Sequence, residues 1–342
     1  MSYFGSHTSV PFIIAEMSGN HNQSLQRALD IVKAAAATGV QAIKLQTYTA
    51  DTITMKGAYT ITDEGSIWKG KELHDLYKLA YTPWEWHAAI FDYARSLGLI
   101  CFSSPFDETA VDFLETLNAP IYKIASFENN HHPLLKKVAQ TGKPVIMSTG
   151  VSDIDDIKES VEVLKQNGCT DLTLLKCTST YPASPENTNL LTIPVLQQLF
   201  PDCTIGLSDH TMGIGVSIAS IALGAKVIEK HFTLSRAEGG VDSVFSMEPM
   251  EMKMLVEESK KAFLALGQPQ LTVQKAEEKS LLFKRSVYVS AEIKAGEIFT
   301  AENIKVIRPG LGLHPRYYEQ LIGKKANQDY QPGTPLTADA LN

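Results

Sequence analysis

The chain of 342 residues has no apolar run of the ~18 to 20 residues that a membrane-spanning helix needs. Its first segment, MSYFGSHTSVPF, lacks a basic region followed by an apolar one, so we expect no signal peptide. Only four cysteines are present, and no two of them form a CxxC pair. Three lie in apolar, strand-like runs, so we expect reduced, buried thiols and a cytoplasmic protein.

An excess of positive charge is also missing. The 31 lysines and arginines are outnumbered by 38 aspartates and glutamates, which gives a net charge of −7. This balance argues against non-specific binding to nucleic acid, and we expect neither a nucleic acid nor a membrane as partner. It leaves room for a small anionic substrate, because a few local lysines can dominate a pocket.

Short apolar runs alternate with helical patterns along most of the chain. Eight runs read as strands: 11–16, 41–46, 99–104, 121–126, 144–149, 172–178, 203–208 and 226–232. They are rich in Ile, Val, Leu or Cys with little alternation, which is typical of parallel strands buried on both faces. Eight such β–α units predict an α/β fold, a (β/α)8 TIM barrel over residues 1–267. A doubly wound sheet is the alternative, but the first turn, AEMSGNHNQS, lacks the usual GxGxxG.

Helix ends can be predicted at several places. Ser24 is the expected N-cap after the first strand, and Gly39 is the expected end of that helix. Ser152 is the expected N-cap after the fifth strand. Between the second strand and TPWEWH lies an insertion, residues 49–81, of the kind that often forms a lid or a specificity loop.

The pattern of apolar and polar residues changes after Gly267. Residues 268–282 are polar and lack a strand–helix rhythm, so we interpret them as a linker. Residues 283–342 read as a small β-rich module, with turns at 294–296 and 309–310.

Polar and ionisable residues stand where the predicted strands end. In a barrel of this kind the active site lies at those carboxyl ends. The residues concerned are Glu16, Lys44, Gln46, Ser103, Ser104, Lys123, Ser126, Glu128, Ser148, Thr149, Lys176, Thr178, Ser208, His210, Glu229 and His231. A buried lysine is costly unless its charge is matched. Lys44 and Lys123, with serines around them, therefore predict a site for a multiply charged anion that carries a phosphate and a carboxylate.

Two successive strands end on histidines, in TIGLSDHTMG and in VIEKHF. Because neighbouring strands lie ~5 Å apart, His210 and His231 could reach one divalent cation. Two protein ligands are too few for a closed structural site, so such a metal would keep open positions for substrate. Glu229 shares the strand parity of His231, so it could point the same way and orient that histidine. A strand-end histidine can also be a hydrogen-bonded polar group without a metal.

The ordered strand-end motifs carry a resemblance. FIIAEMSGNHNQS, AIKLQTYT, CFSSPFD, YKIASFE, IMSTG, KCTSTYP, GLSDHT and IEKHFTL together resemble the sialic acid synthase family. The tail FKRSVYV…IKAGEIFTAENIKVIRPG is similar to the C-terminal antifreeze-like (SAF) domain of that family. Within the family, IWKGKELHDLYKLAYTPWEWH, SSPFD, KIASFE and RPGLGLHP look most like the branch that makes pseudaminic acid.

The resemblance implies a transferase that forms a C–C bond. It would condense phosphoenolpyruvate, water and a 2,4-diacetamido-2,4,6-trideoxy-hexose of the altrose type to give pseudaminic acid and phosphate, with Mn or Mg as cofactor. The implied phosphoenolpyruvate ligands are Lys44, Ser104, Lys123, Ser126, Ser148 and Ser208. The implied metal ligands are His210 and His231, and Glu16 would move a proton. Gln46, Tyr181 and Asp242 would contact the sugar, and Glu128 is assigned to the same substrate site.

The resemblance also implies a domain-swapped homodimer, in which Arg308 of VIRPG reaches the active site of the partner subunit. The neuraminate-making branch has an asparagine where this chain has Ser179 in its CTxxYP motif, which fits a different sugar. A synthase for the neuraminate or legionaminate precursor stays open as an alternative. So does a non-catalytic carbohydrate-binding protein, although a neutral glycan has no use for a pair of lysines.

Overall fold

The computed structural model describes residue 4, residues 10–64 and residues 68–342. Most of the N-terminal segment on which the signal-peptide prediction rests, and residues 65–67 of the insertion, lie outside these described residues. The chain forms two compact units, Met1–Gly267 and Gln268–Asn342. None of the described helices combines the length and the apolar character that crossing a membrane requires. The cytoplasmic location stays a prediction.

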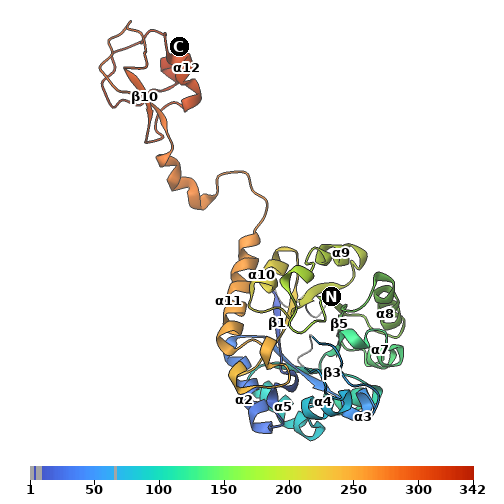
Figure 1. The fold of residues 1–342 in the computed structure, drawn as a ribbon. Coiled ribbons are helices and arrows are strands. Elements are labelled where there is room, and N and C mark those ends of the chain that lie inside the picture. The colour runs from blue at the N-terminus through green and yellow to red at the C-terminus, as the bar shows by residue number, and fades with distance from the viewer. Residues whose placement is uncertain (1–3, 5–9, 65–67) are drawn as a thin grey trace. The chain divides into compact units, whose positions relative to one another are not determined.

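The first unit is a closed barrel of parallel strands (Figure 1), which confirms the predicted fold. Its strands are β1 (Phe12–Glu16), β2 (Ala42–Thr47), β3 (Ile100–Pro105), β4 (Tyr122–Ile124), β5 (Val145–Ser148), β6 (Leu172–Cys177), β7 (Thr204–Ser208) and β8 (Val227–His231). Each strand overlaps one of the predicted runs. The strands pair in sequence order, and β8 pairs with β1 to close the ring, so that Glu16 lies beside His231.

Helices connect the strands and surround the barrel (Figure 1). They are α2 (Leu25–Thr38), α3 (Ala50–Ile53), α4 (Leu73–Ala80), α5 (Trp84–Ser96), α6 (Glu108–Thr116), α7 (His132–Ala139), α8 (Ile154–Gln166), α9 (Thr192–Leu199), α10 (Gly215–Ala222) and α11 (Pro249–Leu266). The first unit also contains the short 3-10 helices η1 (Ser18–His21), η2 (Ser126–Glu128), η3 (Pro185–Asn187), η4 (Arg236–Glu238) and η5 (Ser243–Phe245).

The predicted caps of α2 are confirmed. Ser24 accepts a hydrogen bond from the Arg27 amide, and Gly39 ends the helix at a φ of 87°. The prediction that Ser152 caps α8 is wrong. Asp153 is the N-cap, because its carboxylate accepts hydrogen bonds from two first-turn amides, whereas the Ser152 hydroxyl donates to the Gly150 carbonyl.

Alternate residues of the strands face the interior of the barrel. One buried apolar cluster fills the interior below the carboxyl ends of the strands. It consists of Phe4, Phe12, Ile14, Ala42, Phe102, Ile121, Ile146, Leu175 and Val227. A second, larger cluster contains the outward-facing residues and the helices that pack on them. Gly206 fits this packing, because an added Cβ would lie 2.3 Å from the Val227 carbonyl oxygen. Residues two positions beyond the interior cluster share its parity, so they point into the upper part of the barrel.

The second unit contains an antiparallel pair of strands, β9 (Ser286–Val289) and β10 (Ile304–Ile307). It also contains α12 (Tyr318–Leu321) and the short 3-10 helices η7 (Pro315–Tyr317) and η8 (Ala338–Leu341). Its core is separate from those of the barrel and includes Val287, Val289, Ile293, Phe299 and Leu336. The polar pattern of 268–282 gave no sign of a helix, yet η6 spans Lys275–Phe283. The overlooked signal is a capping box, in which the side chains of Gln274 and Glu277 accept from each other's backbone amides.

Candidate active site

Four charged side chains meet above the apolar layer of the barrel. The Lys44 ammonium lies 2.8 Å from an oxygen of Glu16. The Glu229 carboxylate lies between the two lysines, 3.8 Å from Lys44 and 3.8 Å from Lys123. All four are buried. The structure therefore brings together the two lysines that the sequence predicted, and it matches their charges with two carboxylates.

Serine hydroxyls surround this charged group. The Lys123 ammonium donates to Ser148 Oγ at 2.6 Å, and Lys44 donates to Ser104 Oγ at 3.3 Å. Ser208 donates to Glu229 Oε1 at 3.2 Å, and Ser126 Oγ accepts from the Gly150 amide at 3.2 Å. The hydroxyls of the predicted serines thus line one end of the barrel, where they can turn toward an anion.

Burial and mutual attraction act against each other in this cluster. Burial raises the pKa of Glu16 above its ordinary value, and the negative charge of Glu229 adds to the effect. Burial lowers the pKa of Lys123. For Lys44 and Glu229 the attraction of their partners outweighs burial, so the pKa of Lys44 is raised and that of Glu229 is lowered. Among the four, Glu16 and Lys123 are therefore the groups that most readily take the neutral form.

The two predicted histidines lie beside each other, with ring centroids 5.3 Å apart. The Nδ1 atom of His210 lies 3.0 Å from the Thr178 carbonyl oxygen. Because a carbonyl can only accept, Nδ1 carries a proton, and Nε2 is the nitrogen that can offer a lone pair when the ring is neutral. His231 Nδ1 is buried without a hydrogen-bond partner among the described residues. Burial, helped by the positive charge of Lys44, holds the pKa of His231 well below its usual range, so its ring is neutral.

These two imidazoles fit a divalent cation. Each can offer a ring nitrogen lone pair when its ring is neutral, and the Thr178 carbonyl orients His210 as it would orient a metal ligand. Within residues 4, 10–64 and 68–342 no group of three or more His, Cys, Asp or Glu side chains forms a metal cage. Such a cation would thus rely on two protein ligands and keep several open positions.

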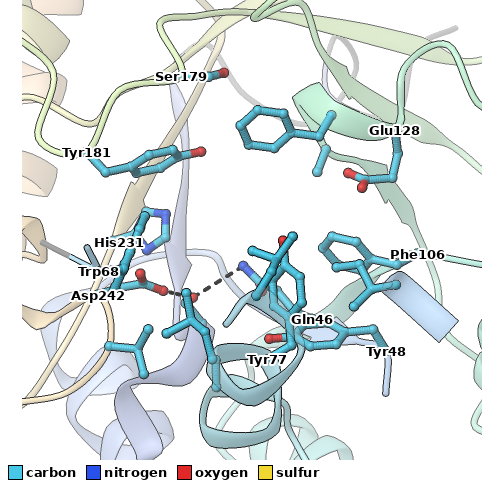
Figure 2. Close-up of a pocket in the computed structure, with 18 of the residues that line it drawn as sticks. Gln46, Tyr48, Trp68, Tyr77, Phe106, Glu128, Ser179, Tyr181, His231 and Asp242 are labelled. Carbon is cyan, nitrogen blue, oxygen red and sulfur yellow. Dashed lines mark hydrogen bonds between the residues drawn. The ribbon is translucent and has the colours of Figure 1, made fainter. Parts of the chain in front are cut away.

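A cavity of about 410 Å³ adjoins the histidines (Figure 2). The three residues assigned to the sugar, Gln46, Tyr181 and Asp242, all line it, and so does Glu128, which was assigned to the substrate site. Gln46 Nε2 donates to Glu16 Oε1 at 2.9 Å and to Ser18 Oγ at 3.3 Å. The Tyr181 ring centroid lies 4.4 Å from that of His210. The predicted sugar contacts are therefore next to the predicted metal ligands and joined to Glu16.

Three residues of the site have positions that the sequence interpretation did not give. Ser18 donates to the Asp242 carboxylate and lines the cavity. It lies in η1, beyond the end of β1, so strand parity does not give the direction of its side chain. Cys177, read as an ordinary buried thiol, lies on the interior face 3.9 Å from His210 Nδ1. Glu229 points inward as its parity predicted, but it forms ion pairs with the two lysines.

Arg308 lies in the second unit, immediately after β10, and its side chain is exposed. The role of Arg308 toward a partner subunit stays a prediction.

Comparison with known proteins follows the same division of the chain. Residues 31–270 match the model of the NeuB family, and residues 284–342 match the SAF domain. A pseudaminic acid synthase of Campylobacter jejuni is 43% identical over 95% of each chain. A pseudaminic acid synthase of Helicobacter pylori is 42% identical, over 97% of this chain and 98% of its own. The crystal structure of a sialic acid synthetase from Leptospira borgpetersenii, in complex with citrate, has 30% identity and a TM-score of 0.72, over 80% of this chain and 90% of that one.

Proposed function

The chain belongs to the NeuB family and is a phosphoenolpyruvate-dependent synthase that condenses this substrate with a sugar, and from that premise we propose its sugar, its metal and its assembly. The sugar is a 2,4-diacetamido-2,4,6-trideoxy-hexose of the altrose type, and the product is pseudaminic acid. Its support is the 42–43% identity to two pseudaminic acid synthases over nearly the whole chain.

The observation that carries the chemistry is the convergence of Lys44 and Lys123, with serines around them, beside a pair of histidines. Phosphoenolpyruvate has a phosphate and a carboxylate, and each lysine can neutralise one of these groups. Ser104, Ser126, Ser148 and Ser208 add hydroxyl donors to the same anion. A non-catalytic carbohydrate-binding protein does not account for the two buried lysines.

The substrate anion must compete with the two resident carboxylates. In the protein without substrate, Glu16 and Glu229 already balance the charges of the lysines. Because burial raises the pKa of Glu16, this residue is the one best suited to take up a proton when the anion arrives. A protonated Glu16 would then leave Lys44 free to pair with substrate.

In the reaction, C3 of phosphoenolpyruvate attacks the aldehyde carbon of the open-chain sugar, and positive charge develops at C2. Water adds at C2, and the tetrahedral intermediate expels phosphate by cleavage of its C–O bond. Lys44 and Lys123 hold the phosphate and carboxylate through these steps. Glu16 lies where it can move a proton to the new alkoxide or from the attacking water.

A divalent cation, Mn or Mg, would be held by His210 and His231. When bound, it supplies polarisation of the aldehyde oxygen. The protein's own contribution is to keep His231 neutral and to orient His210 through the Thr178 carbonyl. Gln46, Glu128, Tyr181 and Asp242 position the sugar, with its acetamido groups, at the adjoining cavity.

The active form is a homodimer in which the second unit of each subunit supplies Arg308 to the barrel of its partner. The support is the exposed position of Arg308 in a unit that matches the SAF domain. A guanidinium at this point would add a donor toward an anionic or carbonyl group of the substrate.

Phosphate release tests the proposed sugar. The purified protein is given phosphoenolpyruvate and Mn²⁺ with three sugars in parallel: altrose-type and mannose-type 2,4-diacetamido-2,4,6-trideoxy-hexoses, and N-acetylmannosamine. We expect the altrose-type sugar to give the highest kcat/KM. Equal values, or a preference for N-acetylmannosamine, would overturn the assignment.

A further inference from the structure

One wall of the substrate cavity is largely apolar, and it comes from the insertion between β2 and α5. Residues of the insertion that line the cavity are Tyr48, Ile53, Ile61, Trp68, Leu73, Leu76, Tyr77 and Ala80. The hydrogen-bonding side chains that line it from other segments are Ser18, Gln46, Glu128, Ser179, Tyr181, His231 and Asp242. In Figure 2, Tyr181, His231 and Asp242 lie across the cavity from Phe106 and Tyr48. The insertion therefore supplies most of the apolar lining of the cavity, while polar side chains stand on both sides of it, with Gln46 and Glu128 on the side of Phe106 and Tyr48.

The helix α4 supplies most of this wall through one of its faces. Leu73, Leu76, Tyr77 and Ala80 are spaced three or four positions apart, so they share a face of the helix. Leu76 is only 5% exposed, whereas Leu79, three positions further along the same helix, is 54% exposed and does not line this cavity. The pattern assigns Leu76 to the cavity and leaves Leu79 as a surface residue of similar chemistry.

The wall is held in place by contacts with the segment after β1 and by a contact within the insertion. Gln23, which follows η1, donates through its amide to the Leu79 and Tyr81 carbonyls at 3.1 and 2.7 Å. His74 Nε2 lies 2.8 Å from an oxygen of Asp51 in α3. An added Cβ at Gly19 would lie 3.1 Å from the Ala80 carbonyl oxygen, which shows how closely α4 packs against η1. The apolar face is thus held at a defined distance from the end of β1.

The orientation of an open-chain sugar in the cavity follows from its reactive end. Its aldehyde carbon must meet C3 of phosphoenolpyruvate, beside His231 and the lysine cluster. The opposite end of the chain, C6, then points away from the barrel axis, toward the insertion. A methyl group at C6 needs no hydrogen-bond partner, whereas a hydroxyl group there would lose water without gaining one.

We propose that Ile53, Leu73 and Leu76 form the subsite for the C6 methyl group and give the enzyme its preference for 6-deoxy sugars over 6-hydroxy sugars. This inference rests on the proposed function, since it assumes a diacetamido hexose in the cavity. The acetamido groups, which carry N–H donors and carbonyl acceptors, bind to polar residues of the same cavity, among them Glu128 and Asp242. An apolar subsite rejects an added hydroxyl only moderately, so we expect a 10- to about 100-fold preference in kcat/KM.

The test compares two matched substrates, the 6-deoxy and the 6-hydroxy forms of the same diacetamido hexose. Their kcat/KM ratio is measured for the wild type, for Leu76→Asn and for the control Leu79→Asn. The amide of Leu76→Asn offers a partner to the hydroxyl, so its ratio should fall about tenfold toward the 6-hydroxy sugar. Leu79→Asn should keep the wild-type ratio. Because both substrates are assayed on one preparation, the ratio does not depend on how much of a variant is folded.

The outcomes separate the two proposals. If the wild type prefers diacetamido sugars but treats the 6-deoxy and 6-hydroxy forms alike, the methyl subsite is wrong and the proposed function stands. An unchanged ratio in Leu76→Asn, or an equal change in Leu79→Asn, also overturns the subsite. If the wild type prefers N-acetylmannosamine to both diacetamido sugars, the proposed function fails and the subsite fails with it.

Discussion

The ammonium of Lys230 lies 3.0 Å from the carboxylate of Asp209, and both side chains are almost completely buried. Lys230 also donates to the carbonyls of Thr211 and Gly213, at 2.7 and 3.0 Å. Asp209 accepts from the Thr211 amide and from Ser217. Each member of the pair directly precedes one of the two active-site histidines. The pair therefore ties the loop after β7 to β8 from the outer side of the barrel.

Removal of one partner of this pair should destabilise the protein strongly. Lys230→Met leaves the Asp209 charge buried without its cation, and we expect the free energy of unfolding to fall by about 3–5 kcal/mol. Urea denaturation measures the change. The double variant Lys230→Met/Asp209→Leu should recover most of the loss, because no unpaired charge remains.

A matched control is available on the surface of α11. Lys261 pairs with Glu258 at 2.6 Å, but both side chains are largely exposed. Lys261→Met should leave the urea midpoint unchanged, since water solvates the remaining carboxylate. If Lys230→Met left the urea midpoint unchanged, as Lys261→Met should, the buried pair would not contribute to stability.

Glu128 should make the stability of the protein depend on pH in an unusual direction. Burial raises the pKa of Glu128 to about 7, from an ordinary value of 4.5, and the attraction of Lys123 only partly opposes it. The folded state therefore binds this proton more tightly than the unfolded state. The contribution of Glu128 to stability is present below pH 4.5 and is lost as the pH rises to about 7, by about 3 kcal/mol in total.

Glu128→Gln isolates this contribution. The variant carries no ionisable group at this position. Its free energy of unfolding, relative to that of the wild type, should therefore rise as the pH increases from 5 to 8. Urea titrations of the two proteins at several pH values give the difference. A difference that stays flat across this range would refute the prediction. The same variant should lose affinity for the sugar if the ionised Glu128 accepts its hydrogen bonds.

Much of the barrel interior could be predicted from the sequence, because side chains alternate between the two faces of each strand. A parallel strand covered on both faces reads as a continuous apolar run, and the polar residue that ends it must face either the barrel interior or the helices. Phe102 and Ser104 share one parity, as do Ile121 and Lys123. The meeting of Lys44 and Lys123 could thus be predicted from spacing alone.

Other parts of the site depend on geometry that spacing does not encode. Glu229 lies at an equal distance from two lysines on different strands, which depends on how the closed barrel places β8 relative to β2 and β4. Ser18 points toward Asp242 from a backbone with a φ of 49°, a conformation that a serine rarely adopts. Ser152 and Asp153 are both good N-caps, and the choice of Asp153 is made by the path of the loop before α8.

Lys123 should be needed for the binding of phosphoenolpyruvate. Lys123→Met removes a buried cation and should raise the KM for phosphoenolpyruvate by about 100-fold, the value of one charge-assisted contact. The KM for the sugar should change much less. Ser148→Ala, which removes the acceptor that orients Lys123 at 2.6 Å, should have a smaller effect of about tenfold.

Initial rates of phosphate release, with each substrate varied in turn, measure both constants. Lys158→Met, a change of an exposed lysine on α8, serves as the control. An equal rise in both KM values for Lys123→Met would point to a general disturbance of the site instead of a contact with the anion.

His210 and His231 should each be required to retain a divalent cation. Removal of one of two protein ligands should weaken Mn²⁺ binding by at least about 100-fold. This is more than the loss of a residue that only hydrogen-bonds to a metal ligand would cause. Elemental analysis after dialysis against Mn²⁺ gives a measure that does not depend on activity. Full turnover of His210→Ala in the presence of a chelator would exclude the metal role. His132→Ala, at the start of α7, is the control.

Arg308 provides a test of the swapped dimer that does not depend on a structure of the assembly. If Arg308 completes the site of the partner, Arg308→Ala and His231→Ala should each be inactive alone. In a mixed dimer, the barrel of the Arg308→Ala subunit retains His231 and receives the intact Arg308 of the other subunit. The second site of that dimer lacks both groups. Random exchange makes half of the dimers mixed, and each has one complete site, so the mixture should recover about one quarter of wild-type activity.

The recovery is measured as phosphate release after the two variants are unfolded and refolded together, beside each variant refolded alone. A mixture of Arg308→Ala with Arg308→Ala/His231→Ala is the matched control, because no combination of its subunits can supply an intact arginine. It should stay inactive whatever the efficiency of refolding. If Arg308 acted within its own subunit, a mixed dimer would contain no complete site, since each chain would lack one of the two groups. Activity at the level of the control would therefore reject the exchange of arginines between subunits.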